Sequence, residues 1–195
     1  MADPVPYDPE HILEVLERHE VRYVIIGGLA AELRGSPYIT RDVDVTPARS
    51  RDNFVRLAAA LRELEAKLRV PDLECPIEVP LGERSFDQGT TWTYTTKYGH
   101  LDIAPLPDGT RGYDDLHRGA TRERLTDALE VSVAALADVI RSKEAAGREK
   151  DRAVLPLLRQ VLERSRGMDR DGPGIGFVTA RVAQPGSRRT TPAGG

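Results

Sequence analysis

The chain has 195 residues and a mass of 21.5 kDa, and 39% of its residues are hydrophobic while 30% are charged. These values are typical of a soluble globular protein with room for one sizeable core. The formal net charge is only -3, which excludes a molecule that binds polyanions with its whole surface, so any nucleic acid must be held by a local basic patch.

The N-terminal residues predict a helix. Asp8 can cap its free N–H groups, and Pro9 is suited to its first turn. An apolar stripe follows at Ile12, Leu13 and Leu16. The residues before this helix lack the basic and apolar regions of a signal peptide, and no apolar run in the sequence approaches the length of a membrane span. We therefore expect a cytoplasmic protein without a membrane partner.

A strand, a turn and a helix are predicted next. Residues 21–26 form a short apolar run rich in β-branched residues, which predicts a buried strand. Gly27 and Gly28 permit a tight turn, residues 29–33 predict a short helix, and Gly35 is suited to end it in the left-handed conformation. Backbone N–H groups at such a turn can receive an anion, so the stretch outlines a phosphate cradle.

Acidic and apolar residues alternate after this turn. On a strand, Asp42 and Asp44 project from one face, while Val43 and Val45 enter the core on the other. Two neighbouring carboxylates repel each other, and magnesium relieves this repulsion when it binds carboxylates and substrate phosphates together. An exposed strand edge with solvated acids is the alternative. The glycine turn upstream favours the metal site.

An amphipathic helix is predicted at residues 51–67, where apolar residues recur at helical spacing. Residues 68–89 contain three prolines and predict a short strand with loops. Cys75 in this segment is interpreted as a small core residue rather than a nucleophile, since no histidine lies near it in the sequence. It is the only cysteine, which excludes an internal disulfide and a cysteine metal cluster and indicates a reducing compartment.

Residues 90–104 predict a β-hairpin with a glycine turn. In its second strand Leu101 and Ile103 face one way and Asp102 faces the other. A carboxylate between two apolar neighbours on a strand needs a partner. That partner is either a basic residue or solvent at an exposed face, or else a cation shared with the first two acids.

Three helices complete the pattern. Residues 113–117 predict a short one, whose adjacent acids we interpret as a cap and surface because neighbouring helical positions point in different directions. From Val133 an inward stripe runs to Lys143, and the stripe of the last helix extends back through Asp151, so both charged side chains should point toward the body of the fold. Pro156 must break or kink that helix. Solvated, salt-bridged helices are the alternative.

The C-terminal residues lack a sustained period. From Met168 onward the chain is rich in Gly, Pro, Arg and Thr, which predicts a flexible tail. The chain is therefore expected to divide into a core at residues 1–125, a helical part at 126–167 and a tail at 168–195.

The motif GG…TRDVDV at residues 27–45 resembles the core of the polymerase-β-type minimal nucleotidyltransferase superfamily, whose members carry a glycine-rich turn, a D-x-D pair and a third acid on a later strand. Together with SKEAAGREKD at residues 142–151, this motif is most similar in sequence to the AbiEii and MenT toxins of bacterial toxin-antitoxin pairs. The similarity covers residues 21–162. It implies an α/β (α+β) nucleotidyltransferase fold, with a small mixed sheet flanked by helices and followed by a C-terminal helical part.

The resemblance also implies a metal site. Asp42 and Asp44 would hold Mg²⁺, or Mn²⁺ in its place, against a nucleoside triphosphate (NTP), and Asp102 would bind a second ion or take a proton from the attacking hydroxyl. The amides of Gly27 and Gly28 would hold terminal phosphates. Most members of the superfamily have serine where this chain has Gly28, so a hydroxyl contact to phosphate is expected to be missing.

Basic residues would complete the nucleotide site that the resemblance implies. Lys143 would bind triphosphate oxygens as a point charge, with help from Arg148. Asp151 would orient Lys143 or a substrate hydroxyl. The sequence does not indicate which NTP is used, because pocket shape and a few hydrogen bonds recognise the base.

The toxin-like resemblance implies addition of nucleotides to the 3′ end of tRNA, which blocks translation, under the control of a cognate antitoxin. That antitoxin would act by binding, or by modifying Thr40, where a phosphate would sit beside the metal site. The alternatives are a small-molecule nucleotidyltransferase of the antibiotic-modifying kind and a non-catalytic module that binds nucleotide or RNA. An RNA acceptor needs a basic surface, and the candidates are Arg111, Arg118, Arg122, Arg124, Arg148, Lys150 and Arg152.

Overall fold

The computed structural model describes residues 6–71, 73, 75–79, 81–82, 86 and 91–171. These residues form one mixed seven-stranded sheet, which confirms the predicted α/β (α+β) fold class. In spatial order the strands are β3 (Lys67–Leu68), β4 (Trp92–Thr96), β5 (Gly99–Ile103), β2 (Asp42–Pro47), β1 (Tyr23–Ile26), β7 (Glu130–Val133) and β6 (Thr121–Arg124). Strand β1 pairs antiparallel with β2 and parallel with β7, and β2 pairs parallel with β5.

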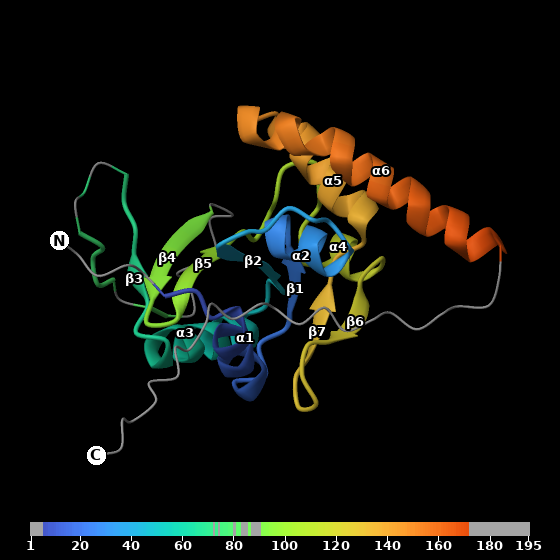
Figure 1. Ribbon diagram of the computed structural model, residues 1–195. Helices are drawn as coiled ribbons and strands as arrows, with labels where there is room; N and C mark the ends of the chain where they lie inside the picture. Colours follow the sequence, from blue (N-terminus) through green and yellow to red (C-terminus); the bar gives the residue numbers. More distant parts are fainter. Residues whose placement is uncertain are drawn as a thin grey trace, which may run out of the picture.

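Helices cover the sheet on two sides. Those of the described residues are α1 (Pro9–Arg18), α2 (Gly27–Leu33), α3 (Arg51–Glu63), α4 (Tyr113–His117), α5 (Leu136–Ala146) and α6 (Glu149–Asp171). In Figure 1, α1 and α3 lie together on one side of the sheet, while α5 and α6 run side by side on the opposite side. Helices α5 and α6 form the expected C-terminal helical part.

The start and stop signals of the first elements act as predicted. The Asp8 carboxylate accepts a hydrogen bond from the backbone N–H of His11 and so caps α1, whose first residue is Pro9. All four residues of β1 are buried. Gly35, just after α2, has a φ of 89°, the left-handed conformation expected for it.

The hairpin of β6 and β7 was not predicted, because the apolar spacing at Val133 indicated a helix start. In the structure Val133 ends β7, pairs with Ile25 of β1, and is buried, and the helix begins only at Leu136. A strand of four residues is too short to show a clear alternation. The sheet therefore continues beyond residue 125, into the part that the sequence assigned to helices.

Helix α6 is longer than predicted. Pro156 does not break it, and it continues to Asp171, so the first residues of the predicted tail are helical. The tail prediction for residues 172–195 lies outside the described residues. Every helix of the described chain is too short or too polar to cross a bilayer.

The prediction for Cys75 is wrong, because its side chain is exposed rather than in the core. Among the described residues between β3 and β4, Ile77 forms a bridge to Leu68 and Leu73 is exposed, whereas Phe86 is fully buried. This bridge and β3 are the short strand structure that was expected there.

Candidate active site

Two parallel strands bring the predicted acids together. Strands β2 and β5 pair with Asp44 opposite Asp102 and Val43 opposite Leu101. Val43 and Leu101 are fully buried, so the two carboxylates project from the other face. Asp42 lies on the same face, two positions before Asp44. The structure thus places the three predicted acids on one side of the sheet.

The glycine turn packs directly on Asp44. Gly27 has a φ of 70°, and a Cβ atom at this position would lie 2.1 Å from Asp44 Oδ2. A side chain at residue 27 would therefore displace the carboxylate. The backbone N–H of Gly28 also faces Asp44 and donates toward its carboxylate. The turn holds the acid in place, and the binding of phosphate by its amides stays a prediction.

Gly27→Ala is expected to lower the free energy of unfolding by at least about 1–2 kcal/mol, the cost of a left-handed non-glycine residue, to which the contact with Asp44 adds. Urea denaturation measures the change. Gly167→Ala is the control, because a Cβ atom there meets nothing within 4 Å and alanine favours the helix by about 1 kcal/mol. A Gly27→Ala protein as stable as the wild type would contradict this packing.

All eight residues that the sequence singled out for the site line one cleft. The cleft has a volume of about 380 Å³, within the range of small-molecule sites. A larger hollow of about 660 Å³ beside β3 and β4 is lined by none of the eight. The eight residues are Gly27, Gly28, Asp42, Asp44, Asp102, Lys143, Arg148 and Asp151.

Burial and repulsion by neighbouring carboxylates make the charged form of Asp44 unfavourable. Burial raises the pKa of Asp44 to about 7, and the carboxylates of Asp102 and Asp42 add to the rise. The N–H of Gly28 and the ammonium of Lys143 oppose it. The pKa of Asp102 is also raised, chiefly by burial. Carboxyl groups held in this way gain from a bound cation.

The donor atoms on this wall fit a hard divalent cation. Asp102 Oδ1 is buried and has no hydrogen-bond partner among the described residues, which is costly unless something binds it. With Asp42 and Asp44 it offers oxygen ligands, which suit Mg²⁺ or Mn²⁺. In the described ranges no three acidic, histidine or cysteine side chains already enclose a metal position, so the carboxylates would draw together around the ion.

The other wall of the cleft carries an ion pair whose carboxylate is buried. Lys143 of α5 donates to Asp151 Oδ1 of α6 over 2.9 Å, and Asp151 is only 4% exposed. Asp151 Oδ2 is buried and finds no hydrogen-bond partner in the described part of the chain. Both side chains point toward the body of the fold, as predicted. Arg148 lies nearby, 4.0 Å from Asp108, and is exposed.

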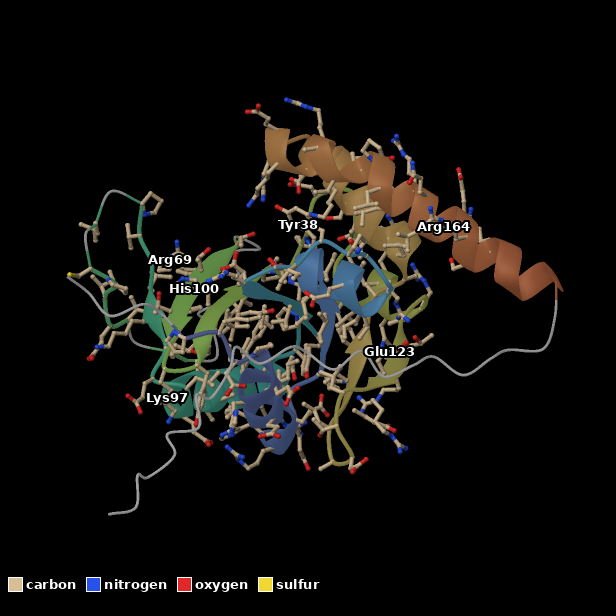
Figure 2. All side chains as sticks on the ribbon, in the orientation of Figure 1. Tyr38, Arg69, Lys97, His100, Glu123 and Arg164 are labelled. Carbon is tan, nitrogen blue, oxygen red and sulfur yellow. The ribbon has the colours of Figure 1, made fainter. Side chains whose placement is uncertain are left out.

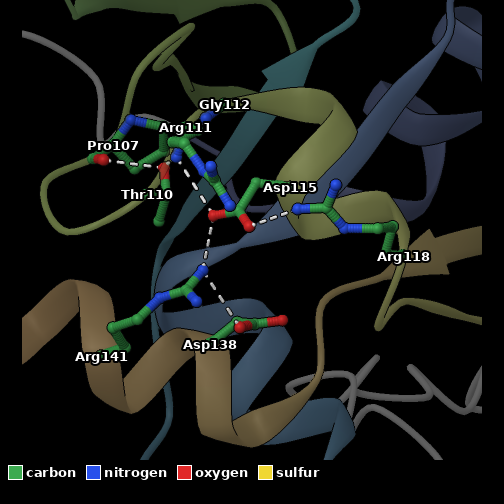
Figure 3. A network of polar contacts seen from close by, with 8 residues as sticks. All are labelled: Pro107, Thr110, Arg111, Gly112, Asp115, Arg118, Asp138 and Arg141. Carbon is green, nitrogen blue, oxygen red and sulfur yellow. Dashed lines mark hydrogen bonds and ion pairs between the residues drawn. The ribbon is translucent and has the colours of Figure 1, made fainter.

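A separate polar network joins α4 to α5 (Figure 3). The Asp115 carboxylate accepts hydrogen bonds from the backbone N–H of Arg111 and from the guanidinium groups of Arg118 and Arg141. Arg141 also pairs with Asp138 at 3.2 Å. The Arg111 N–H, aided by the arginines, holds the pKa of Asp115 below its usual value. Asp115 therefore links two helices, and its side chain is only 10% exposed, so the prediction of a surface acid is wrong for this residue.

The loop between α2 and β2 adds cleft residues that sequence reasoning missed. Tyr38 and Ile39 are 57% and 73% exposed, and both line the cleft with Arg41. Figure 2 places Tyr38 between the end of the sheet and α6. The loop has no periodic pattern, so its position just before the D-x-D pair is the one signal that points to these residues.

Of the seven predicted basic residues, Arg148 and Lys150 line the cleft. Arg122 and Arg124 lie instead on β6, where both pair with Glu130, and they do not line it. A large acceptor at the cleft would thus meet the beginning of α6 rather than β6.

Known proteins share this architecture but little of the sequence. No protein-family model matches the chain, and no curated protein matches it significantly. The lincosamide antibiotic adenylyltransferase LnuA, solved with lincomycin, superposes with a TM-score of 0.51 at 14% identity, over 77% of this chain and 94% of that chain. ANT(2″)-Ia in complex with adenylyl-2″-tobramycin gives a TM-score of 0.50 at 16% identity, over 81% and 89% respectively. The chain has the nucleotidyltransferase fold.

Proposed function

We propose that this chain is a metal-dependent nucleotidyltransferase, which moves a nucleotidyl group from an NTP to an acceptor hydroxyl. The observation that carries the proposal is the pairing of Asp44 with Asp102 in a cleft whose other wall presents Lys143. The raised pKa of Asp44 and the unpaired oxygen of Asp102 support it, because both call for a cation.

Asp42 and Asp44 would hold Mg²⁺, with Mn²⁺ as the alternative, against the triphosphate. When bound, the ion neutralises phosphate charge and the charge that develops on the leaving group. The acceptor oxygen attacks the α-phosphorus, the bond from that phosphorus to pyrophosphate breaks, and the hydroxyl proton must leave. Asp102 either takes this proton, a role that its raised pKa favours, or binds a second ion.

Positively charged and polar groups would position the triphosphate. Lys143 reaches its oxygens as a point charge, and Arg148 assists from the rim. The amides of Gly27 and Gly28 would hold terminal phosphates, and the Gly28 amide must first release the Asp44 carboxylate to which it donates. Asp151 fixes Lys143 through their ion pair or accepts a bond from a substrate hydroxyl. Most of the rate enhancement then comes from positioning and charge stabilisation.

For the acceptor we propose the 3′ end of tRNA, in a cytoplasmic toxin held in check by an antitoxin protein. The similarity of residues 27–45 and 142–151 to AbiEii and MenT toxins supports this choice. Arg148 and Lys150 at the cleft supply positive charge that a phosphate backbone would meet.

A small antibiotic is the second candidate acceptor. It is favoured by the two superposed structures, one solved with lincomycin and one with adenylyl-2″-tobramycin. A cleft of about 380 Å³ is also of the size that small ligands occupy. An enzyme for either acceptor would use the same metal site. The two enzymes would differ in the protein surface around the cleft that binds the acceptor.

Labelled NTPs decide between them. The protein is incubated with Mg²⁺, each NTP labelled on its α-phosphate, and either total tRNA or a panel of aminoglycosides and lincosamides. We expect label on tRNA, none after chelation of the metal, and none with Asp42→Ala. Label that appears on small molecules alone would overturn the tRNA proposal. If no acceptor is labelled and wild type and Asp42→Ala slow growth equally in cells, the chain binds without catalysis.

A further inference from the structure

Residues 28 and 40 compete for one space beside the acids. A Cβ atom on Gly28 would lie 2.6 Å from both Cβ and Oγ1 of Thr40, which is closer than real Cβ contacts. Thr40 therefore fills the place into which a side chain at residue 28 would project. Serine at residue 28 and threonine at residue 40 exclude each other unless the backbone moves.

The Thr40 hydroxyl keeps its proton available. Oγ1 accepts a hydrogen bond from the backbone N–H of Asp42 at 3.4 Å, and the Thr40 N–H lies 3.5 Å from Glu32 Oε2. Among the described residues the Oγ1–H itself has no acceptor. Thr40 is half-buried and lines the cleft together with the glycine turn and the three acids. The hydroxyl thus stands as a free donor at the mouth of the turn.

We propose that Thr40 donates a hydrogen bond to a phosphate oxygen of the NTP. This inference rests on the proposed nucleotidyl transfer and names a binding residue for it. The hydroxyl that is absent from residue 28 is supplied from residue 40, in the same space but from the strand side of the turn. The Asp42 N–H donates to Oγ1 at 3.4 Å, so the hydroxyl lies beside the acids before substrate arrives.

Substitution of Thr40 tests the donor. Binding of Mg²⁺ complexes of the four NTP analogues with a methylene α,β-bridge is measured by titration calorimetry, beside the corresponding nucleosides. Thr40→Val keeps the shape and removes the hydroxyl, and we expect its triphosphate affinity to fall about tenfold while any nucleoside affinity stays the same. Thr40→Ser should bind almost as well as the wild type. Thermal unfolding of each variant checks that the fold is intact.

A reciprocal exchange separates a donor from a mere packing residue. Gly28→Ser alone should weaken binding, because its side chain collides with Thr40. Gly28→Ser combined with Thr40→Gly should regain triphosphate affinity, since the new hydroxyl enters the vacated space. The comparison of Gly28→Ser with the double variant tests the donor even if Thr40→Val does not fold.

The outcomes distinguish this inference from the proposed function. Wild-type protein that binds none of the analogues would refute nucleotidyl transfer, and the role of Thr40 with it. Wild-type binding that Thr40→Val retains in full would refute the role of Thr40 alone. An exchanged pair that is folded but binds no better than Gly28→Ser would likewise refute it.

Discussion

At pH 8, Asp44→Asn is expected to lose nucleotidyl transfer by at least about 10³-fold and yet to be more stable than the wild type. Activity falls because the metal ligand and its charge are lost, and the ion contributes several kcal/mol to the transition state. Stability rises because asparagine can still accept from the Gly28 N–H while it removes a buried charge that faces Asp42 and Asp102.

The gain in stability should depend on pH. Burial raises the pKa of Asp44 in the folded state to about 7, above the usual value of 3.8. Between these values the unfolded chain releases a proton that the folded chain retains, so wild-type stability falls as pH rises through this window. The advantage of Asp44→Asn should therefore be absent near pH 4 and reach about 2 to 4 kcal/mol above pH 7.

Urea denaturation across pH, with and without Mg²⁺, checks this expectation. Added Mg²⁺ should stabilise the wild type and not Asp44→Asn. Asp52→Asn is the control, because Asp52 is exposed in the first turn of α3 and should change stability by less than about 0.5 kcal/mol. An Asp44→Asn protein that is active would show that Asp44 does not hold the cation. One that is less stable than the wild type at pH 8 would show that the charge of Asp44 does not destabilise the fold.

Lys143→Met is expected to destabilise the protein by about 3 to 5 kcal/mol, the usual cost of leaving a buried charge without its partner. Asp151 is 4% exposed, Lys143 donates to its Oδ1, and its Oδ2 has no partner among the described residues. Once Lys143 is gone, the folded state must keep the Asp151 carboxylate in the cleft wall without its partner.

The double variant Lys143→Met with Asp151→Leu should recover most of the lost stability, because it removes both charges. Nucleotidyl transfer should stay absent, since the cation proposed to bind the triphosphate is missing. Arg159→Met is the matched control: Arg159 joins the same two helices through Glu144 at 2.6 Å, but both side chains are exposed, so we expect at most about 1 kcal/mol. A Lys143→Met loss no larger than this would show that the pair is not buried in solution.

The acids could be predicted because strands have a period of two. Asp42, Asp44 and Asp102 alternate with apolar residues, and this fixes the face from which they project. Helical stripes gave the directions of Lys143 and Asp151 in the same way. Local periodicity therefore gave the directions of these side chains, whereas the resemblance to nucleotidyltransferases grouped them into one site. Neither specifies that Asp44 stands opposite Asp102.

Other features depend on contacts between distant segments. Strand β7 was mistaken for a helix start because four residues give little pattern, and its pairing with β1 joins residues far apart in the sequence. The exclusion between Gly28 and Thr40 depends on how the turn approaches the next strand. Cys75 was misplaced because a single small residue among prolines has no periodic pattern that would indicate its exposure.

The two walls of the cleft come from different parts of the chain. Asp42, Asp44 and Asp102 precede Lys143 and Asp151 in the sequence, and a ribosome makes proteins from the N-terminus. A nascent chain therefore exposes the acidic wall before its basic counterpart exists. The proposed triphosphate site would be complete only after α5 and the first turn of α6 have been synthesised and have docked, so an unfinished polypeptide would lack the cations proposed to hold the nucleotide.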